Sequence, residues 1–97
     1  MTMYNPPHPG EFISEIYLEP NGLSGRVLAE SLGVAASTVS RILKGSGRVT
    51  PEMALRLSKS LGRSPESWLA MQDAHDLWQA RKQVDIRGIE KLKFSEV

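Results

Sequence analysis

The sequence has no cysteine among its 97 residues, which excludes disulfide bonds, cysteine-bound zinc and thiol catalysis. Aromatic residues contribute only 6%, and no apolar stretch is long enough to cross a membrane. Residues 1–7 lack the hydrophobic region of a signal peptide. We therefore expect a single cytoplasmic domain that does not enter a membrane and that gains stability from dimerisation because it is small.

The chain has no large excess of charge of one sign, since its formal net charge is +1. The positive and negative charges are nevertheless segregated along the sequence. Residues 1–40 contain four glutamates and one cation, Arg26, and the charged residues between 64 and 80 are all acidic. Residues 41–63 contain one acid, Glu52. Their six cations are Arg41, Lys44, Arg48, Arg56, Lys59 and Arg63. This basic segment predicts a phosphate-contacting surface, with a solvated helix face as the alternative interpretation.

Apolar residues recur at helical spacing and no segment alternates as a β-strand does, so the sequence predicts an all-α fold of five helices. Serine, threonine and proline mark helix starts, and glycines mark helix ends. We expect Pro20 to end the first helix, since proline cannot continue the hydrogen-bond ladder. The predicted helices run over about Pro9–Leu18, Ser24–Leu32, Ala36–Lys44, Thr50–Gly62 and Ser64–Arg81.

The second and third predicted helices carry the most informative pattern. Leu28, Val39, Ile42 and Leu43 are expected to face the core, and Gly33 supplies a tight turn between the helices. This spacing is typical of a helix-turn-helix, in which the second helix enters the DNA major groove. The expected division is a helix-turn-helix DNA-binding domain over residues 1–81 and a C-terminal tail over residues 82–97, docked on a dimer or mobile.

The outward side chains of the third helix are the candidate DNA contacts. Arg41 is the strongest candidate base reader, because a guanidinium donates two parallel hydrogen bonds to guanine. Ser37 and Thr38 lie at the end that enters the groove first, and they complete the base-reading set. The predicted phosphate contacts, which orient the protein without reading sequence, are Ser24, Arg26, Ser40, Lys44, Ser46 and Arg48. For Ser24, a helix cap is an equally good interpretation.

One face of the fifth predicted helix carries Trp68, Met71, His75 and Trp78. Trp68 is expected in the core, whereas Met71, His75 and Trp78 are predicted to form a self-association surface. His75 is expected to pack among these rings rather than to bind metal, since His8 lies far away in sequence. We predict no metal, no cofactor and no enzymatic activity, because no phosphate-binding glycine loop, nucleophile elbow or carboxylate pair is present.

The helix-turn-helix residues Leu28-Ala29, Leu32-Gly33-Val34 and Val39-Ser40-Arg41 resemble the lambda-repressor-like, or Xre, family. A narrower resemblance, to the HigA-type antitoxins of HigB–HigA modules, rests on further segments. These are His8-Pro9-Gly10-Glu11, Tyr17-Leu18-Glu19-Pro20, Gly45–Pro51 and Ser64-Pro65-Glu66-Ser67-Trp68-Leu69.

The resemblance implies a homodimer that represses its own operon by binding a palindromic operator. It also implies a complex with a small basic toxin that cleaves messenger RNA on the ribosome. Two rival interpretations are a free-standing repressor without a toxin and a toxin-binding module with little DNA specificity. The toxin-binding module is suggested by departures from the family pattern. Gly25 and Ala36 replace longer polar side chains, and Ala35 replaces a capping serine.

Overall fold

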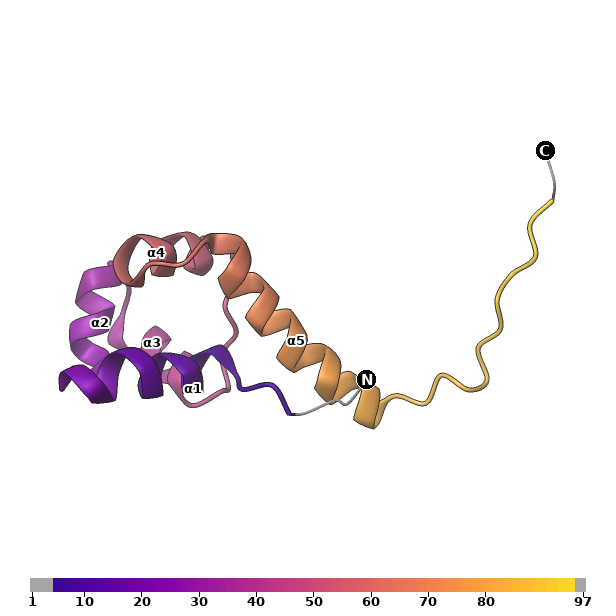
Figure 1. Ribbon diagram of the computed structural model, residues 1–97, viewed down its shortest axis with the longest axis horizontal. Helices are drawn as coiled ribbons and strands as arrows, with labels where there is room; N and C mark the ends of the chain where they lie inside the picture. The colour runs from indigo at the N-terminus through magenta and orange to yellow at the C-terminus, as the bar shows by residue number, and fades with distance from the viewer. Residues whose placement is uncertain (1–4, 96–97) are drawn as a thin grey trace.

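The computed structural model describes residues 5–95, and these form five α-helices with no β-strand. Helices α1 to α4 make a small body, α5 leaves it, and the tail extends beyond α5 (Figure 1). The predicted all-α fold is confirmed. The elements are α1 (Pro9–Ile13), η1 (Ser14–Leu18), η2 (Glu19–Asn21), α2 (Gly25–Leu32), α3 (Ala36–Leu43), α4 (Pro51–Leu61) and α5 (Pro65–Gln83).

The first helical segment ends at Leu18, as predicted, but it changes its pitch on the way to Pro20. In an α-helix the Pro20 ring would clash with the Ile16 carbonyl. The structure widens here into the π-helical turn η1, in which the Glu19 N–H donates to the Ser14 carbonyl five residues back. The 3-10 turn η2 follows, and Gly22 ends it in the left-handed conformation at φ +63°. The predicted end of the first helix at Leu18 is therefore confirmed, while the widening into a π turn before Pro20 was not predicted.

Helices α2 and α3 form the predicted helix-turn-helix. The Ser24 hydroxyl accepts from the Val27 N–H at 3.2 Å, which is the expected cap of α2. Gly33 adopts φ +73°, and both its N–H and that of Val34 donate to the Ala29 carbonyl. Ala35 begins α3 without a side-chain hydrogen bond, so this helix lacks a cap that is worth about 1 kcal/mol in other helices.

A single hydrophobic core joins all five helices. Trp68 of α5 is completely buried in it, and its indole N–H donates to the Gly62 carbonyl at 2.9 Å. Hydrogen bonding at the ring edge removes the cost of burying a polar group with the apolar ring. The buried apolar residues are Ile13, Leu18, Leu28, Ala29, Leu32, Val39, Ile42, Val49, Met53, Ala54, Leu57 and Trp68.

The segment His8-Pro9-Gly10 fixes α1 against α3. The His8 ring accepts from the Gly10 N–H at 2.9 Å through Nδ1, and Pro9 occupies the first turn, where its missing N–H costs nothing. A Cβ at Gly10 would overlap the Ile42 carbonyl oxygen and lie 2.8 Å from the Leu43 Cα. Only glycine permits this close approach of the two helices.

His8 and His75 lie together despite their separation in sequence. Their ring centroids are 5.1 Å apart in an edge-on arrangement, and His75 Nδ1 lies 3.0 Å from the Pro6 carbonyl oxygen. The expectation that His75 packs among the tryptophan rings is therefore wrong. Within residues 5–95 no group of three potential metal ligands is assembled.

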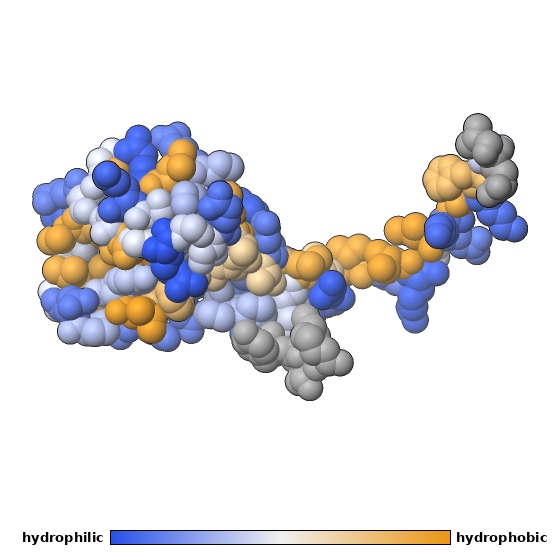
Figure 2. All heavy atoms as spheres, turned by 45° about the horizontal axis from the view of Figure 1, so that its top comes forward, coloured by the Kyte–Doolittle hydropathy of each residue, from blue (hydrophilic) through white to orange (hydrophobic). Residues whose placement is uncertain are grey.

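Helix α5 ends at Gln83, two residues beyond its predicted end, and residues 84–95 continue without helix or strand. This stretch is exposed and carries apolar side chains along its length, as Figure 2 shows for the projecting arm. Leu92 and Phe94 are 73% and 78% exposed. No helix within residues 5–95 has the length and hydropathy needed to span a membrane.

Replacing Gly10 with alanine is expected to destabilise the fold by about 3 kcal/mol, since the added methyl group forces the α1 backbone away from α3. Urea unfolding of the purified protein measures the change. Gly88→Ala is the matched control, because no atom lies within 4 Å of the added Cβ. Equal midpoints for the two variants would contradict the close approach.

Burial first, and then the neighbouring His75, lower the pKa of His8 below its ordinary value of 6.5, while Gly47 and Asp76 oppose the shift. The unfolded chain therefore binds this proton more readily than the folded chain. The stabilisation is complete above about pH 6.5 and is lost as the pH falls through the lowered folded-state pKa. Protonation also removes the Nδ1 acceptor of Gly10.

We expect the free energy of unfolding to fall as the pH drops below about 6.5, and His8→Asn to flatten this dependence. Asparagine can still accept from the Gly10 N–H but does not titrate. Urea titrations at several pH values compare the two proteins. The same slope in both would show that His8 does not carry the pH dependence.

Candidate nucleic-acid interface

Helix α3 presents a polar face beside the start of α2. Its opposite face is buried through Val39 and Ile42, which lie against the core. The predicted base readers Ser37 and Arg41 are exposed and Thr38 is half-buried, so the structure brings all three to the accessible side of one helix. This placement is the one that a recognition helix requires.

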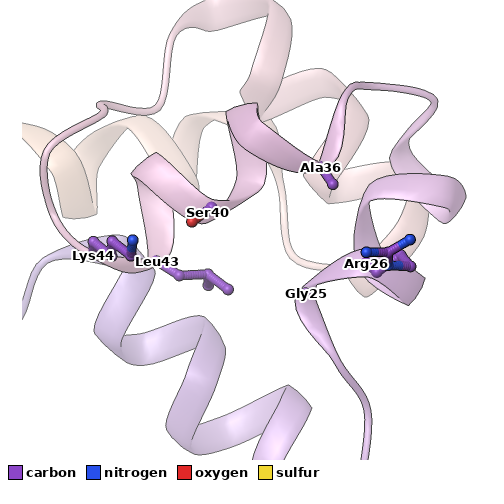
Figure 3. Close-up of a pocket in the computed structure, with 6 residues that line it drawn as sticks. All are labelled: Gly25, Arg26, Ala36, Ser40, Leu43 and Lys44. Atoms are coloured by element: carbon purple, nitrogen blue, oxygen red, sulfur yellow. The ribbon is translucent and has the colours of Figure 1, made fainter.

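Three cations surround this face, and their charges are not neutralised by acids among the described residues. Arg26, Arg41 and Lys44 are exposed, and within residues 5–95 none of them forms an ion pair. Arg26 and Lys44 lie at opposite ends of a surface hollow between α2 and α3 (Figure 3). An unpaired cation at the edge of a protruding helix is well placed to meet a phosphate.

The hollow has a volume of about 360 Å³ and is lined by Gly25, Arg26, Ala36, Ser40, Leu43 and Lys44. Leu43 packs against the core, as predicted, but it is only half-buried, and its side chain also extends toward Gly25 at this surface (Figure 3). A Cβ at Gly25 would lie 3.1 Å from the Leu43 Cδ1. The absence of a side chain at Gly25 therefore leaves room for Leu43 at this surface.

The two predicted phosphate-contacting serines that flank the helix-turn-helix both act as caps. Ser24 accepts from Val27, as described above, and the Ser46 hydroxyl donates to the Arg41 carbonyl at 3.3 Å. The N–H groups of Ser46 and Gly47 donate to the same carbonyl at 3.0 and 2.9 Å. Both hydroxyls remain exposed, so a phosphate contact for either stays a prediction.

Arg48, another predicted phosphate contact, is engaged by acids of α5. Its guanidinium donates to Asp76 at 2.5 Å and lies 3.9 Å from Asp73. Asp76 also accepts from Gln72, whose buried side chain accepts from the Val49 N–H at 2.7 Å. This network ties the loop after α3 to α5. Arg48 would have to leave it to contact DNA.

Half of the predicted basic surface is thus structural. Besides Arg48, Arg56 pairs with Glu52 at 3.0 Å and donates to the Leu32 carbonyl at 2.7 Å, where it holds the end of α2 against α4. Arg63 lies over the Phe12 ring at 5.2 Å and donates to Ser67. These three arginines have partners within the fold, and a phosphate contact for any of them stays a prediction.

Two positioning residues were missed in the sequence. Arg56 reads as a solvated cation, although the four-residue spacing from Glu52 was a visible sign of an ion pair. Gln72 reads as a surface residue of α5 and is 1% exposed. Nothing in the local sequence indicates that a backbone N–H from another segment needs its oxygen.

The predicted self-association residues are partly used within the monomer. Met71 packs against the core, His75 contacts Pro6 and His8, and the Lys82 ammonium lies 4.2 Å from the centroid of the Trp78 ring. The larger exposed apolar surface lies further along the chain. It comprises Leu77, Val84 and Ile86, which are 50%, 58% and 64% exposed.

The fold and the exposed cations around α3 define a helix-turn-helix DNA-binding protein. Residues 15–68 match the family model described as Helix-turn-helix. The chain is 44% identical to an uncharacterized HTH-type transcriptional regulator, YddM of Escherichia coli K12, over 95% of this chain and 97% of that protein. It is 40% identical to Antitoxin HigA-1 of Vibrio cholerae, over 96% and 84% of the two chains.

Among solved structures, the antitoxin GraA in complex with its operator superposes with a TM-score of 0.85 at 40% identity, covering 97% of this chain and 98% of that one. The chain belongs to the helix-turn-helix family and, within it, to the HigA-type antitoxins. The relatives are named as regulators and antitoxins rather than enzymes.

Proposed function

We propose that this chain represses its own operon as a two-fold dimer on a palindromic operator and neutralises a small basic, ribosome-dependent, mRNA-cleaving toxin of the HigB type. The observation that carries the proposal is a set of three cations, Arg26, Arg41 and Lys44, that form no ion pair in the described part of the chain and surround an exposed recognition helix. The operator complex of GraA supports the DNA-binding part. Such a repressor acts in the cytoplasm, where its DNA lies.

The proposed DNA contacts divide into two groups. Ser37, Thr38 and Arg41 read base edges, because they occupy the accessible side of α3. Arg26 and Lys44 hold phosphates on either side of that helix, since they lie at the two ends of the hollow (Figure 3). Residues 1–81 act as the DNA-binding domain in this scheme, and residues 82–97, of which the structure describes all but the last two, act as a tail.

Dimerisation is proposed through the end of α5 and the tail. Leu77, Val84 and Ile86 present contiguous apolar surface there. The interface has to place the two copies of α3 about 34 Å apart, one turn of the duplex, for both to enter the major groove.

The toxin-binding surface is proposed on the acidic first segment. Glu11, Glu15 and Glu19 follow a four-residue spacing along the helical turns of residues 9–21, and all three are exposed. An acidic surface speeds encounter with a basic partner. A free-standing repressor is the second candidate, favoured by the name of YddM, and it requires no such partner.

Arg41→Ala is expected to lose discrimination at one base pair per half-site, at a cost of about 1–3 kcal/mol, because the paired hydrogen bonds to guanine disappear. Arg26→Ala is expected to weaken operator and scrambled DNA alike and to lower the salt slope by about one. Fluorescence anisotropy titrations over a range of salt concentrations measure both. Arg48→Ala should lower the salt slope less than Arg26→Ala, since Asp76 already holds its guanidinium.

An unchanged ratio of operator to scrambled affinity in Arg41→Ala would remove Arg41 as the reader. If the unmodified chain itself shows no preference for DNA upstream of its own gene, the chain is a toxin-binding module with little DNA specificity. The repressor half of the proposal then fails.

The antitoxin half predicts that the tagged chain co-purifies from its native cells with an equal amount of a small basic protein encoded beside it. Glu15→Lys should reduce this recovery through charge repulsion while retaining binding to the operator. Mass spectrometry identifies the partner. Recovery of the chain alone, still able to retard its own promoter DNA, would establish a plain repressor.

A further inference from the structure

The surface hollow beside the recognition helix has features that the proposed contacts do not use. Its floor is carbon, formed by Gly25, the Ala36 methyl group and the Leu43 side chain, while Arg26 and Lys44 stand at its ends (Figure 3). A carbon floor within a face that is otherwise polar leaves apolar surface in water. Such a surface gains free energy when an apolar group covers it.

We propose that this hollow is a specificity site for the 5-methyl group of a thymine in the operator. The inference rests on the proposed DNA-binding function, and it adds the identity of one base that the hollow recognises. In the major groove thymine is the base of unmodified DNA that presents a methyl group, with the O4 acceptor beside it. The two cations at the ends of the hollow direct it toward the backbone of the same duplex.

The half-buried hydroxyl of Ser40 gives the hollow its polar group. Ser40 lies four residues after Ala36 and three before Leu43, so the three side chains occupy one face of α3. A hydroxyl beside a carbon floor matches the edge of thymine, because it can donate to O4 while the methyl group rests on Leu43 and Ala36. Ser40 then reads a base rather than a phosphate, which was its role in the sequence prediction.

Two small residues keep the hollow open. Any side chain at Gly25 starts 3.1 Å from the Leu43 Cδ1 and 3.6 Å from the Val39 Cγ1, so it has to turn into the hollow or displace Leu43. Ala36 is exposed at the first turn of α3, and a longer side chain there would cover the same floor. Where the family pattern has longer polar side chains, Gly25 and Ala36 thus leave an apolar surface for a base to contact.

The test replaces thymine with deoxyuridine, which removes the methyl group and keeps O4, one position at a time in a duplex from upstream of the gene. One thymine per half-site is expected to lose about four-fold in affinity on replacement, and both together about 15-fold, as the loss of one buried methyl group predicts. Ala36→Gln fills the hollow and should bind thymine and deoxyuridine duplexes equally. Leu55→Gln, an exposed position on α4, should keep the four-fold difference.

If no thymine position responds while the chain still prefers its promoter, the methyl-reading site is refuted and the proposed function stands. The site is also refuted if a position responds equally in Ala36→Gln, since another side chain then reads the methyl group. A gain in affinity on converting cytosines to 5-methylcytosine, with no effect of deoxyuridine, assigns the hollow to methylated cytosine and overturns the choice of thymine. With no promoter preference at all, the methyl-reading site and the repressor half of the proposed function both fall.

Discussion

The contact of Gly10 with the backbone of Ile42 and Leu43 determines how the recognition helix is held. The close approach places α1 directly behind α3, and α2 packs on α3 from the side. The buried Val39 and Ile42 fill the space between these elements. The polar face of α3 projects because α1 and α2 pack against the apolar face of the helix, and its direction follows from this packing rather than from the helix itself.

Cations with an acid, a carbonyl group or an aromatic ring nearby join segments of the fold, and exposed cations without such a neighbour are available to bind DNA. Arg48, Arg56 and Arg63 each find an acid, a carbonyl group or an aromatic ring within the fold. The exposed ion pairs contribute little to stability, about 0–1 kcal/mol each, but they orient the segments that they join. Arg26, Arg41 and Lys44, which form no ion pair within residues 5–95, lie around the recognition helix. The weak net charge of the chain therefore conceals a local concentration of positive charge where the operator is expected.

The elements whose signals are local could be predicted from the sequence. Ser24, Thr50 and Ser64 each cap the helix that follows, because a hydroxyl at that position accepts from an N–H three residues later. Features that depend on distant residues could not. Arg48 meets Asp76, 28 positions away, and Gln72 is buried because a loop amide arrives beside it. The end of the first helix at Leu18 could be predicted from Pro20, whereas the widening into a π turn before it could not.

Helix α5 joins two parts of the molecule that otherwise do not meet, the DNA-facing body and the exposed tail (Figure 1). Its first half is anchored by Trp68 and by the hydrogen bonds from Gln72 to Val49, and its second half projects from the body. One continuous helix therefore connects the exposed end of α5 to the loop that follows the recognition helix. The direction of α5 from that loop thus determines where the exposed tail begins.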